Sequence, residues 1–165
     1  MNTNKTVMKW SEMRNIAVTI PSEGITIGTV EDLYFKPGTN AVYALKVRLR
    51  LLGDRSLPVI GIRSVGIDAI TIPSAEMLIE RLPPLPLVGS LLTAKINSES
   101  GKDVGGVGEV LIGIDPPVAM RIVGFEMATV SGRRSSHPVT LGADAVGNYR
   151  DGVVVITDTA AKRLR

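Results

Sequence analysis

The chain has no cysteine, a single histidine, and aromatic residues at only 4% of its 165 positions. Without thiols, disulfide bonds and thiolate metal sites are excluded, and His137 alone cannot form one of the usual zinc ligand sets. A core with so few aromatic rings has to be built from Val, Ile and Leu, which favour pleated sheets. We therefore expect an aliphatic β-protein with no cofactor, no metal site and no small-molecule substrate.

Long apolar runs are also missing, because prolines and charged residues interrupt each of them. A membrane-spanning helix needs about 20 apolar residues. Met1 is followed by polar residues and not by the apolar segment of a signal peptide. These features predict a cytoplasmic protein. The net charge of +3 is well below that of a dedicated nucleic-acid-binding domain.

Two stretches half a chain apart follow one plan, a long strand, a tight turn and a second long strand. They cover residues 24–47 and 101–127, and short segments after each of them also match. Short strands separated by turn residues are typical of barrels and sandwiches. A proline-rich joint at residues 82–87 separates the copies. The sequence thus predicts two domains, residues 1–82 and 83–165.

Local patterns predict further details of each copy. Gly28 interrupts an alternating strand and indicates a bulge or bend. Helical spacing at residues 74–82, with Ser74 as N-cap, and at residues 158–164, with Asp158 as N-cap, predicts a closing helix in each copy. Ser11 is a candidate N-cap near the start of the chain, residues 91–96 are expected to be a strand, and residues 131–137 are expected to form a polar loop.

Four segments of the first copy resemble the PRC-barrel family: GTVEDLYF at residues 28–35, VYALKV at 42–47, LPV at 57–59 and VGIDAITI at 65–72. The second copy matches less closely, and its GGVGEVL at residues 105–111 has Glu109 where the first copy has Asp32. The resemblance covers roughly residues 8–80 and 88–160. It implies two tandem small antiparallel β-barrels. Lys36 replaces the Asp that the family usually has there, so no acidic site is implied at this turn.

The resemblance also implies a class of function. Known members include the cytoplasmic domain of the photosynthetic reaction-centre H subunit, half of a ribosome-maturation factor, and stand-alone archaeal proteins, some of them linked to cell division. In the well-understood cases the barrel is a docking surface without catalytic residues. The resemblance therefore implies a non-enzymatic protein–protein interaction or assembly module, and the stand-alone archaeal type fits the architecture best.

The strongest candidate binding residues are Lys46, Arg48 and Arg50, which alternate with Leu45, Val47, Leu49 and Leu51. Alternation places the three cations on one sheet face, where they could bind an acidic protein, an RNA backbone or an anionic membrane surface. This stripe favours the alternative function, a ribosome- or RNA-associated assembly factor. The alternative interpretation of the stripe is an ordinary solvated face, or a strand edge protected by charge.

Three other features have a structural and a functional interpretation. Trp10 is either a core residue at a barrel mouth or an exposed anchor for a partner. Asp32 and Glu109 are hairpin-pinning carboxylates or, less simply, a symmetric cation site. The glycine-rich GKDVGGVG at residues 101–108 lacks the GK[ST] ending of a phosphate loop, so a bent strand is expected. Ala128 and Val130, on the face equivalent to the stripe, suggest self-association.

Overall fold

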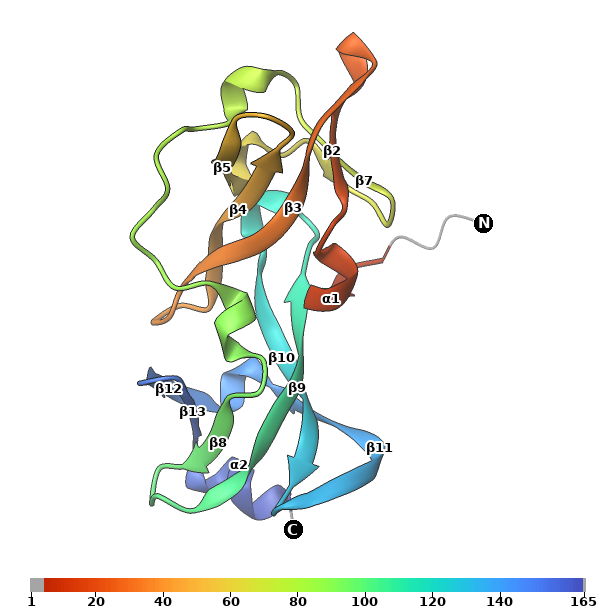
Figure 1. Ribbon diagram of the computed structural model, residues 1–165. Helices are drawn as coiled ribbons and strands as arrows, with labels where there is room; N and C mark the ends of the chain where they lie inside the picture. Colours follow the sequence, from red (N-terminus) through yellow and green to blue (C-terminus); the bar gives the residue numbers. More distant parts are fainter. Residues whose placement is uncertain (1–4, 165) are drawn as a thin grey trace.

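The computed structural model describes residues 5–164, except the side chains of residues 135, 136 and 138. Strands dominate it, and the two α-helices, α1 (Trp10–Met13) and α2 (Asp158–Arg163), are short (Figure 1). The predicted all-β class is confirmed. No helix within the described residues has the length and apolarity needed to cross a membrane.

Among the described residues, the first copy contains seven strands and the second contains six, and the last six strands of the first copy correspond to those of the second. The strands are β1 (Val7–Lys9), β2 (Ala17–Ile20), β3 (Ile25–Lys36), β4 (Ala41–Leu49), β5 (Gly53–Pro58), β6 (Ser64–Val65), β7 (Ala69–Thr71), β8 (Lys95–Ser98), β9 (Asp103–Gly113), β10 (Arg121–Val130), β11 (Arg133–Gly142), β12 (Val146–Arg150) and β13 (Val153–Ile156). Single 3₁₀ turns occur at η1 (Pro21–Glu23), η2 (Val59–Gly61), η3 (Ala75–Met77), η4 (Val88–Leu91), η5 (Pro117–Ala119) and η6 (Ala143–Ala145).

The strand order has an internal two-fold symmetry. Hydrogen-bonded neighbours run β12-β13-β8-β9-β10-β4-β3-β2-β7-β6, with β11 beside β10, β5 beside β4 and β1 beside β9. Corresponding strands of the two copies therefore lie the same number of positions away from the central β10–β4 pair in this order. Within the described residues this path does not return on itself, so closure into two barrels stays a prediction. Strands from both sides of the predicted division belong to one sheet, and β1 pairs with β9 across it. The division into two domains stays a prediction.

The pairing registers define which residues correspond. β7 runs parallel to β2 with Ala17 opposite Ala69, and β13 runs parallel to β8 with Lys95 opposite Val153. The next pairs outward, Val65 with Ile70 and Tyr149 with Val154, make Tyr149 the counterpart of Val65. The Val-Gly pairs at residues 65–66 and 146–147 would instead place Val146 opposite Val65, because the loops of the two copies differ in length.

The core is mainly aliphatic, as the composition predicts, and Phe35 and Phe125 are its largest fully buried side chains. Val30, Leu33, Leu45 and Val47 are fully buried in the first copy, and the second copy buries the corresponding alternating positions of β9 and β10. Beside Gly28 the β2–β3 register shifts by one residue, which confirms the predicted irregularity. A Cβ on Gly28 would lie 2.5 Å from the carbonyl oxygen of Arg48, so only glycine fits this close approach.

Several local predictions are wrong. Residues 74–82 form only the η3 turn, because the backbone of Ile79 is engaged with Ser56 at the edge of β5 (N···O 2.7 and 2.8 Å). In α2 the N-cap is Thr157, whose Oγ1 accepts from the Ala160 N–H, and Asp158 instead accepts from the Ser100 N–H and hydroxyl.

Three further segments differ from the predictions. Ser11 does not cap α1, because that helix begins one residue earlier, at Trp10. Residues 88–91 are a 3₁₀ turn and the strand begins only at Lys95, while the expected polar loop at residues 131–137 enters strand β11 at Arg133. Turn and strand compete closely in such short polar segments, and pairing with β10 decides the outcome here.

Candidate functional site

The two long hairpins meet at their turn ends. The Val42 N–H donates to the Met120 carbonyl (2.9 Å) and the Ile122 N–H donates to the Asn40 carbonyl (2.8 Å), so equivalent segments of the two copies pair with each other. Figure 1 shows the β3–β4 hairpin extending into the second copy and the β9–β10 hairpin extending into the first. This pairing is the centre of the internal symmetry.

The leading segment of each copy pairs with the other copy. β1 pairs with β9 of the second copy, with Lys9 opposite Leu111. In the equivalent place, Leu87 forms a bridge with Tyr34 of β3 and the Phe35 N–H donates to the Pro86 carbonyl (3.1 Å). The proline-rich joint therefore contributes a paired segment to the sheet.

Asp32 holds one exchanged turn. Its Oδ1 accepts from the indole Nε1 of Trp10 (2.9 Å) and from the backbone N–H groups of Gly89 (3.0 Å) and Leu33 (2.7 Å). A Cβ added to Gly89 would collide with the Asp32 carboxylate, so the backbone of η4 itself contacts this side chain. Trp10 is half-buried against the core, with the Arg14 guanidinium 5.7 Å from its ring centroid.

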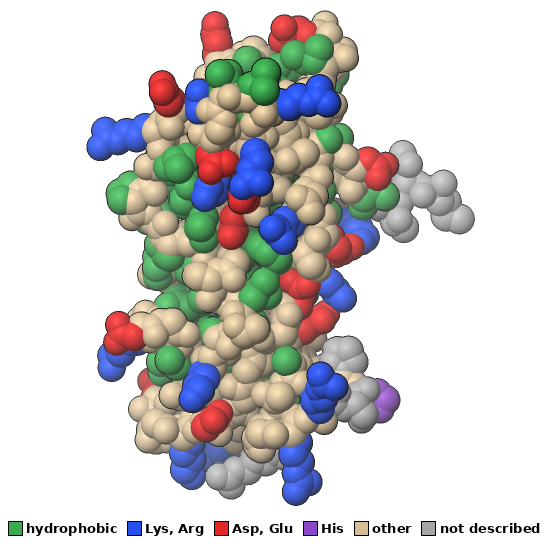
Figure 2. All heavy atoms as spheres, in the orientation of Figure 1, with side chains coloured by type: hydrophobic (Ala, Val, Ile, Leu, Met, Phe, Trp, Pro, Cys, Tyr) green, Lys and Arg blue, Asp and Glu red, His purple; other side chains and the backbone are tan. Residues whose placement is uncertain are grey.

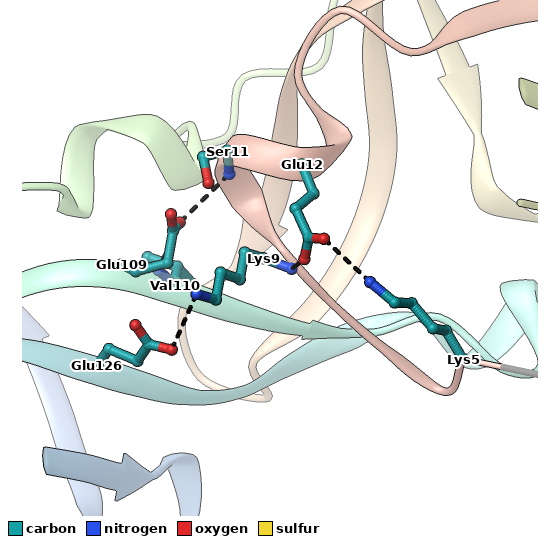
Figure 3. A network of polar contacts seen from close by, with 7 residues as sticks. All are labelled: Lys5, Lys9, Ser11, Glu12, Glu109, Val110 and Glu126. Carbon is teal, nitrogen blue, oxygen red and sulfur yellow. Dashed lines mark hydrogen bonds and ion pairs between the residues drawn. The ribbon is translucent and has the colours of Figure 1, made fainter. Parts of the chain in front are cut away.

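Glu109 holds the other exchanged turn, as Figure 3 shows. Its Oε1 accepts from the backbone N–H groups of Ser11 (3.3 Å) and Val110 (3.0 Å). Lys9, at the end of β1, adds an ion pair to Glu126 of β10 (3.4 Å). We call the two arrangements, Asp32 with η4 and Glu109 with α1, the exchange contacts.

The exchange contacts account for the predicted carboxylate pair. Asp32 and Glu109 each accept two or more N–H groups, which is the hairpin-pinning interpretation of the sequence. Within the described part of the chain, no group of three or more His, Cys, Asp or Glu could hold a metal ion. Residues 103–108 of the glycine-rich motif belong to strand β9, in agreement with the expected bent strand.

The basic stripe is only partly formed. Lys46 and Arg48 project from β4, but β4 ends at Leu49, so Arg50 lies in the following turn. The expected burial of Leu51 is therefore wrong, and its side chain is 92% exposed. Arg55, on the neighbouring strand β5, donates to the backbone carbonyls of Leu52 (2.8 Å) and Asp54 (3.0 Å).

Two carboxylates reduce the positive charge of the stripe. Glu31 lies 2.7 Å from an Arg48 nitrogen, and Asp54 lies 3.7 Å from Arg48 and 3.8 Å from Lys46. Burial raises the pKa of the nearby Tyr34 hydroxyl, and the negative charges of Asp54, Asp32 and Glu31 raise it further. Arg48 remains accessible, with 62% of its side chain exposed. Binding by Lys46, Arg48 and Arg50 stays a prediction.

An apolar surface where the copies meet was not predicted. Turn η2 of the first copy contacts η5 of the second, and Ile60 and Val118 on these turns are 80% and 61% exposed. Tyr43, 43% exposed, lines a hollow of about 270 Å³ beside Ile60, with the Lys36 ammonium 5.1 Å from its ring centroid. We call Tyr43, Ile60 and Val118 the junction surface.

The other side of the centre is covered. There the Tyr149 hydroxyl donates to the Asn40 side chain (2.8 Å), and its ring meets Phe35 edge-on at 5.4 Å. Burial raises the pKa of Tyr149 well above its usual range. The counterpart of Tyr149 is Val65, which is too short to reach across in this way and has no hydroxyl. The two sides of the symmetric centre thus differ, and only one presents exposed apolar side chains.

No protein-family model matches this chain, and a search of curated proteins finds no match to it either. The PRC-barrel resemblance therefore rests on the residues quoted above.

No motif or spacing in the sequence points to the junction surface. Ile60 lies two residues after the Pro58 of a strand, and Val118 lies in a Pro-Pro turn, where an aliphatic residue can be buried or exposed. Only the contact between η2 and η5, from different copies, brings them together.

Proposed function

We propose that this protein is a non-enzymatic assembly module in which two PRC-barrel-like copies bind another protein through the junction surface. The proposal includes two closed barrels and a cytoplasmic location, as the sequence predicts. It is supported chiefly by one observation, the exposure of Ile60 and Val118 at the uncovered side of the symmetric centre.

The exposed side chains favour a protein partner. Ile60 and Val118 face solvent on two turns, η2 and η5, that contact each other. Contiguous apolar groups beside a shallow hollow are typical of protein–protein contacts, in which a few central side chains supply most of the binding energy. The hollow of about 270 Å³ can accept one apolar side chain of a partner.

The test is affinity capture from cells of the source organism with the full chain. The Ile60→Ser, Val118→Ser variant is expected to lose a partner that the unchanged chain retains, because the apolar contact is removed. Leu51→Ser is the matched control, since Leu51 is also exposed but lies in the β4–β5 turn. A partner retained by all three proteins contradicts the junction surface, and a partner lost only with Leu51→Ser places it elsewhere.

The basic stripe supports the alternative, an RNA-associated assembly factor. Arg48 and Arg50 are exposed, although Glu31 and Asp54 offset part of their charge. Phosphate binding weakens steeply with salt because counterions are released. An RNA titration at two salt concentrations is expected to lose this dependence when Lys46, Arg48 and Arg50 are changed to Ala. Unchanged affinity in the variant contradicts an RNA role for the stripe.

Self-association, predicted from Ala128 and Val130, has a separate test. Ala128 is exposed and Val130 is half-buried at the end of β10. If this face joins two chains, the mass in solution rises with concentration, and Ala128→Glu lowers it by placing a charge in the contact. A single monomer mass over a wide concentration range contradicts self-association.

A further inference from the structure

The turn between β4 and β5 has two leucines at its tip. Leu51 is 92% exposed and Leu52 is 67% exposed, although turns normally present polar residues. The equivalent turn of the second copy, between β10 and β11, is Ser131-Gly132. A polar pair is therefore sufficient to make this hairpin, and the fold does not require the leucines.

The backbone of this turn is fixed. The Arg55 guanidinium donates to the Leu52 carbonyl (2.8 Å), and Gly53 provides the left-handed conformation, with φ of 77°. Because Arg55 is bonded back to the turn, the two leucines are held out in solvent and do not fold back onto the sheet. The turn presents them together at one end of the molecule.

Cations surround the leucines. Arg50 precedes them directly and has no ion-pair partner among the described residues, while Arg48 lies two residues further back. Lys46, Arg48, Arg50 and Arg55 face only two nearby carboxylates, Glu31 and Asp54, so this region has an excess of positive charge. Figure 2 shows hydrophobic side chains beside Lys and Arg side chains at the upper end of the molecule, where Figure 1 places the β4–β5 turn.

The surface next to the turn is also apolar in part. A hollow of about 410 Å³ is lined by residues 26–29 of β3 and residues 48–50 at the end of β4. Ile25, immediately before this stretch, is 45% exposed. The leucines therefore adjoin a concavity with arginine at its rim.

We propose that the Leu51–Leu52 tip and the arginines behind it bind the surface of an anionic phospholipid bilayer. The leucines enter the boundary between headgroups and acyl chains, and the Arg50 and Arg48 guanidinium groups bind lipid phosphates. A protruding tip suits this partner better than a protein, because stable protein contacts need about 800 Å² on each side. The tip lies apart from the junction surface, so this binding is independent of the proposed protein partner.

The test is co-sedimentation of the full chain with vesicles, either phosphatidylcholine alone or phosphatidylcholine with phosphatidylglycerol. We expect weak binding to the anionic vesicles and little to the neutral ones. Leu51→Ser with Leu52→Ser should reduce the partition coefficient at least about tenfold. Arg50→Ala should reduce it about fivefold, since one cation near an anionic surface contributes roughly that factor.

Controls separate this site from general stickiness and from misfolding. Ile67→Ser removes an exposed apolar side chain from the segment between β6 and β7, outside both proposed surfaces, and should leave vesicle binding unchanged. The turn variants should retain the circular dichroism spectrum, because both leucines are exposed. Equal binding by the leucine variant overturns the proposal, as does equal binding to neutral and anionic vesicles. Absence of vesicle binding by the unchanged chain also overturns it and favours a protein at this tip.

Discussion

The two copies hold each other by equivalent contacts made with different side chains. In the first copy Asp32 accepts the Gly89 N–H, whereas in the second the longer Glu109 accepts the N–H of Ser11. Where the carboxylate is short, the exchanged turn comes so close that a Cβ at position 89 would collide with it. Where the carboxylate is long, the turn stands further off and a serine fits. The two contacts are thus equivalent in position, although the carboxylate and the turn residue differ between the copies.

The same comparison separates structure from candidate function. Positions that match in the two copies, such as Gly28 and Gly105, serve the sheet. Positions that differ include Leu51, whose counterpart is the Ser131-Gly132 turn, and Val65, whose counterpart is Tyr149. At these positions the copies differ in whether apolar groups are exposed or covered. Substitutions at corresponding positions test how closely the copies correspond.

The largest difference is expected between Asp32→Ala and Glu109→Ala. Removing Asp32 leaves the Trp10, Leu33 and Gly89 N–H groups without their acceptor, at a cost of about 3 kcal/mol. Removing Glu109 frees only two N–H groups, and that of Ser11 is exposed, so the cost should be about 1 kcal/mol. Urea unfolding measures both. Asp32→Asn retains an acceptor and should lie between Asp32→Ala and the unchanged chain, while equal costs for the two alanine variants contradict the comparison.

Gly28→Ala and Gly105→Ala should both destabilise the fold, by about 2 kcal/mol each. The added methyl would meet the Arg48 carbonyl in the first copy and the Thr129 carbonyl in the second. Thermal unfolding followed by circular dichroism checks the pair. Gly38→Ala is the control, because nothing lies within 4 Å of its added Cβ. A tolerated Gly105→Ala with a damaging Gly28→Ala would mean that the copies are not equivalent at this position.

Trp10→Phe should cost at least about 1 kcal/mol, because the indole donor to Asp32 is lost together with one ring of the side chain. The counterpart of Trp10 is the fully buried Val88, which has no such donor. A double-mutant cycle with Asp32→Ala isolates the bond. If Trp10→Phe costs the same with and without Asp32, the hydrogen bond does not contribute to stability.

The smallest effect concerns acid stability. The Lys9 backbone N–H, and then the Lys5 ammonium, lower the pKa of Glu12 below 4.5. A lowered folded-state pKa stabilises the fold above the unfolded-state pKa, and this contribution disappears as the pH falls through the folded-state pKa. Glu12 is largely solvated, so the expected size is roughly a few tenths of a kcal/mol.

Glu12→Gln should remove this part of the pH dependence in urea titrations between neutral pH and pH 3. The counterpart, Ser90, donates its hydroxyl to the Leu87 carbonyl and does not titrate there. Ser90→Ala should therefore leave the pH profile unchanged in shape. An identical profile for Glu12→Gln and the unchanged chain contradicts the role of Glu12.

Much of the fold could be predicted, because apolar and polar residues alternate along the strands. Leu45, Val47 and Leu49 are buried between the more accessible Lys46 and Arg48, as their spacing of two predicts. The prediction failed two residues later at Leu51, since alternation alone cannot say where a strand stops. It failed again at residues 74–82, where an edge of β5 takes up the Ile79 backbone in place of a helix.

By itself, the sequence determined an aliphatic all-β chain with a duplicated hairpin, because hydrophobic spacing and turn residues act within a few positions of each other. The tertiary structure decided that each copy's leading segment crosses to the other, with Ser11 bound to Glu109 and Gly89 to Asp32. It also decided which apolar groups remain exposed at the junction surface and at the Leu51–Leu52 tip. Those outcomes depend on contacts between residues far apart in the chain, which no local pattern records.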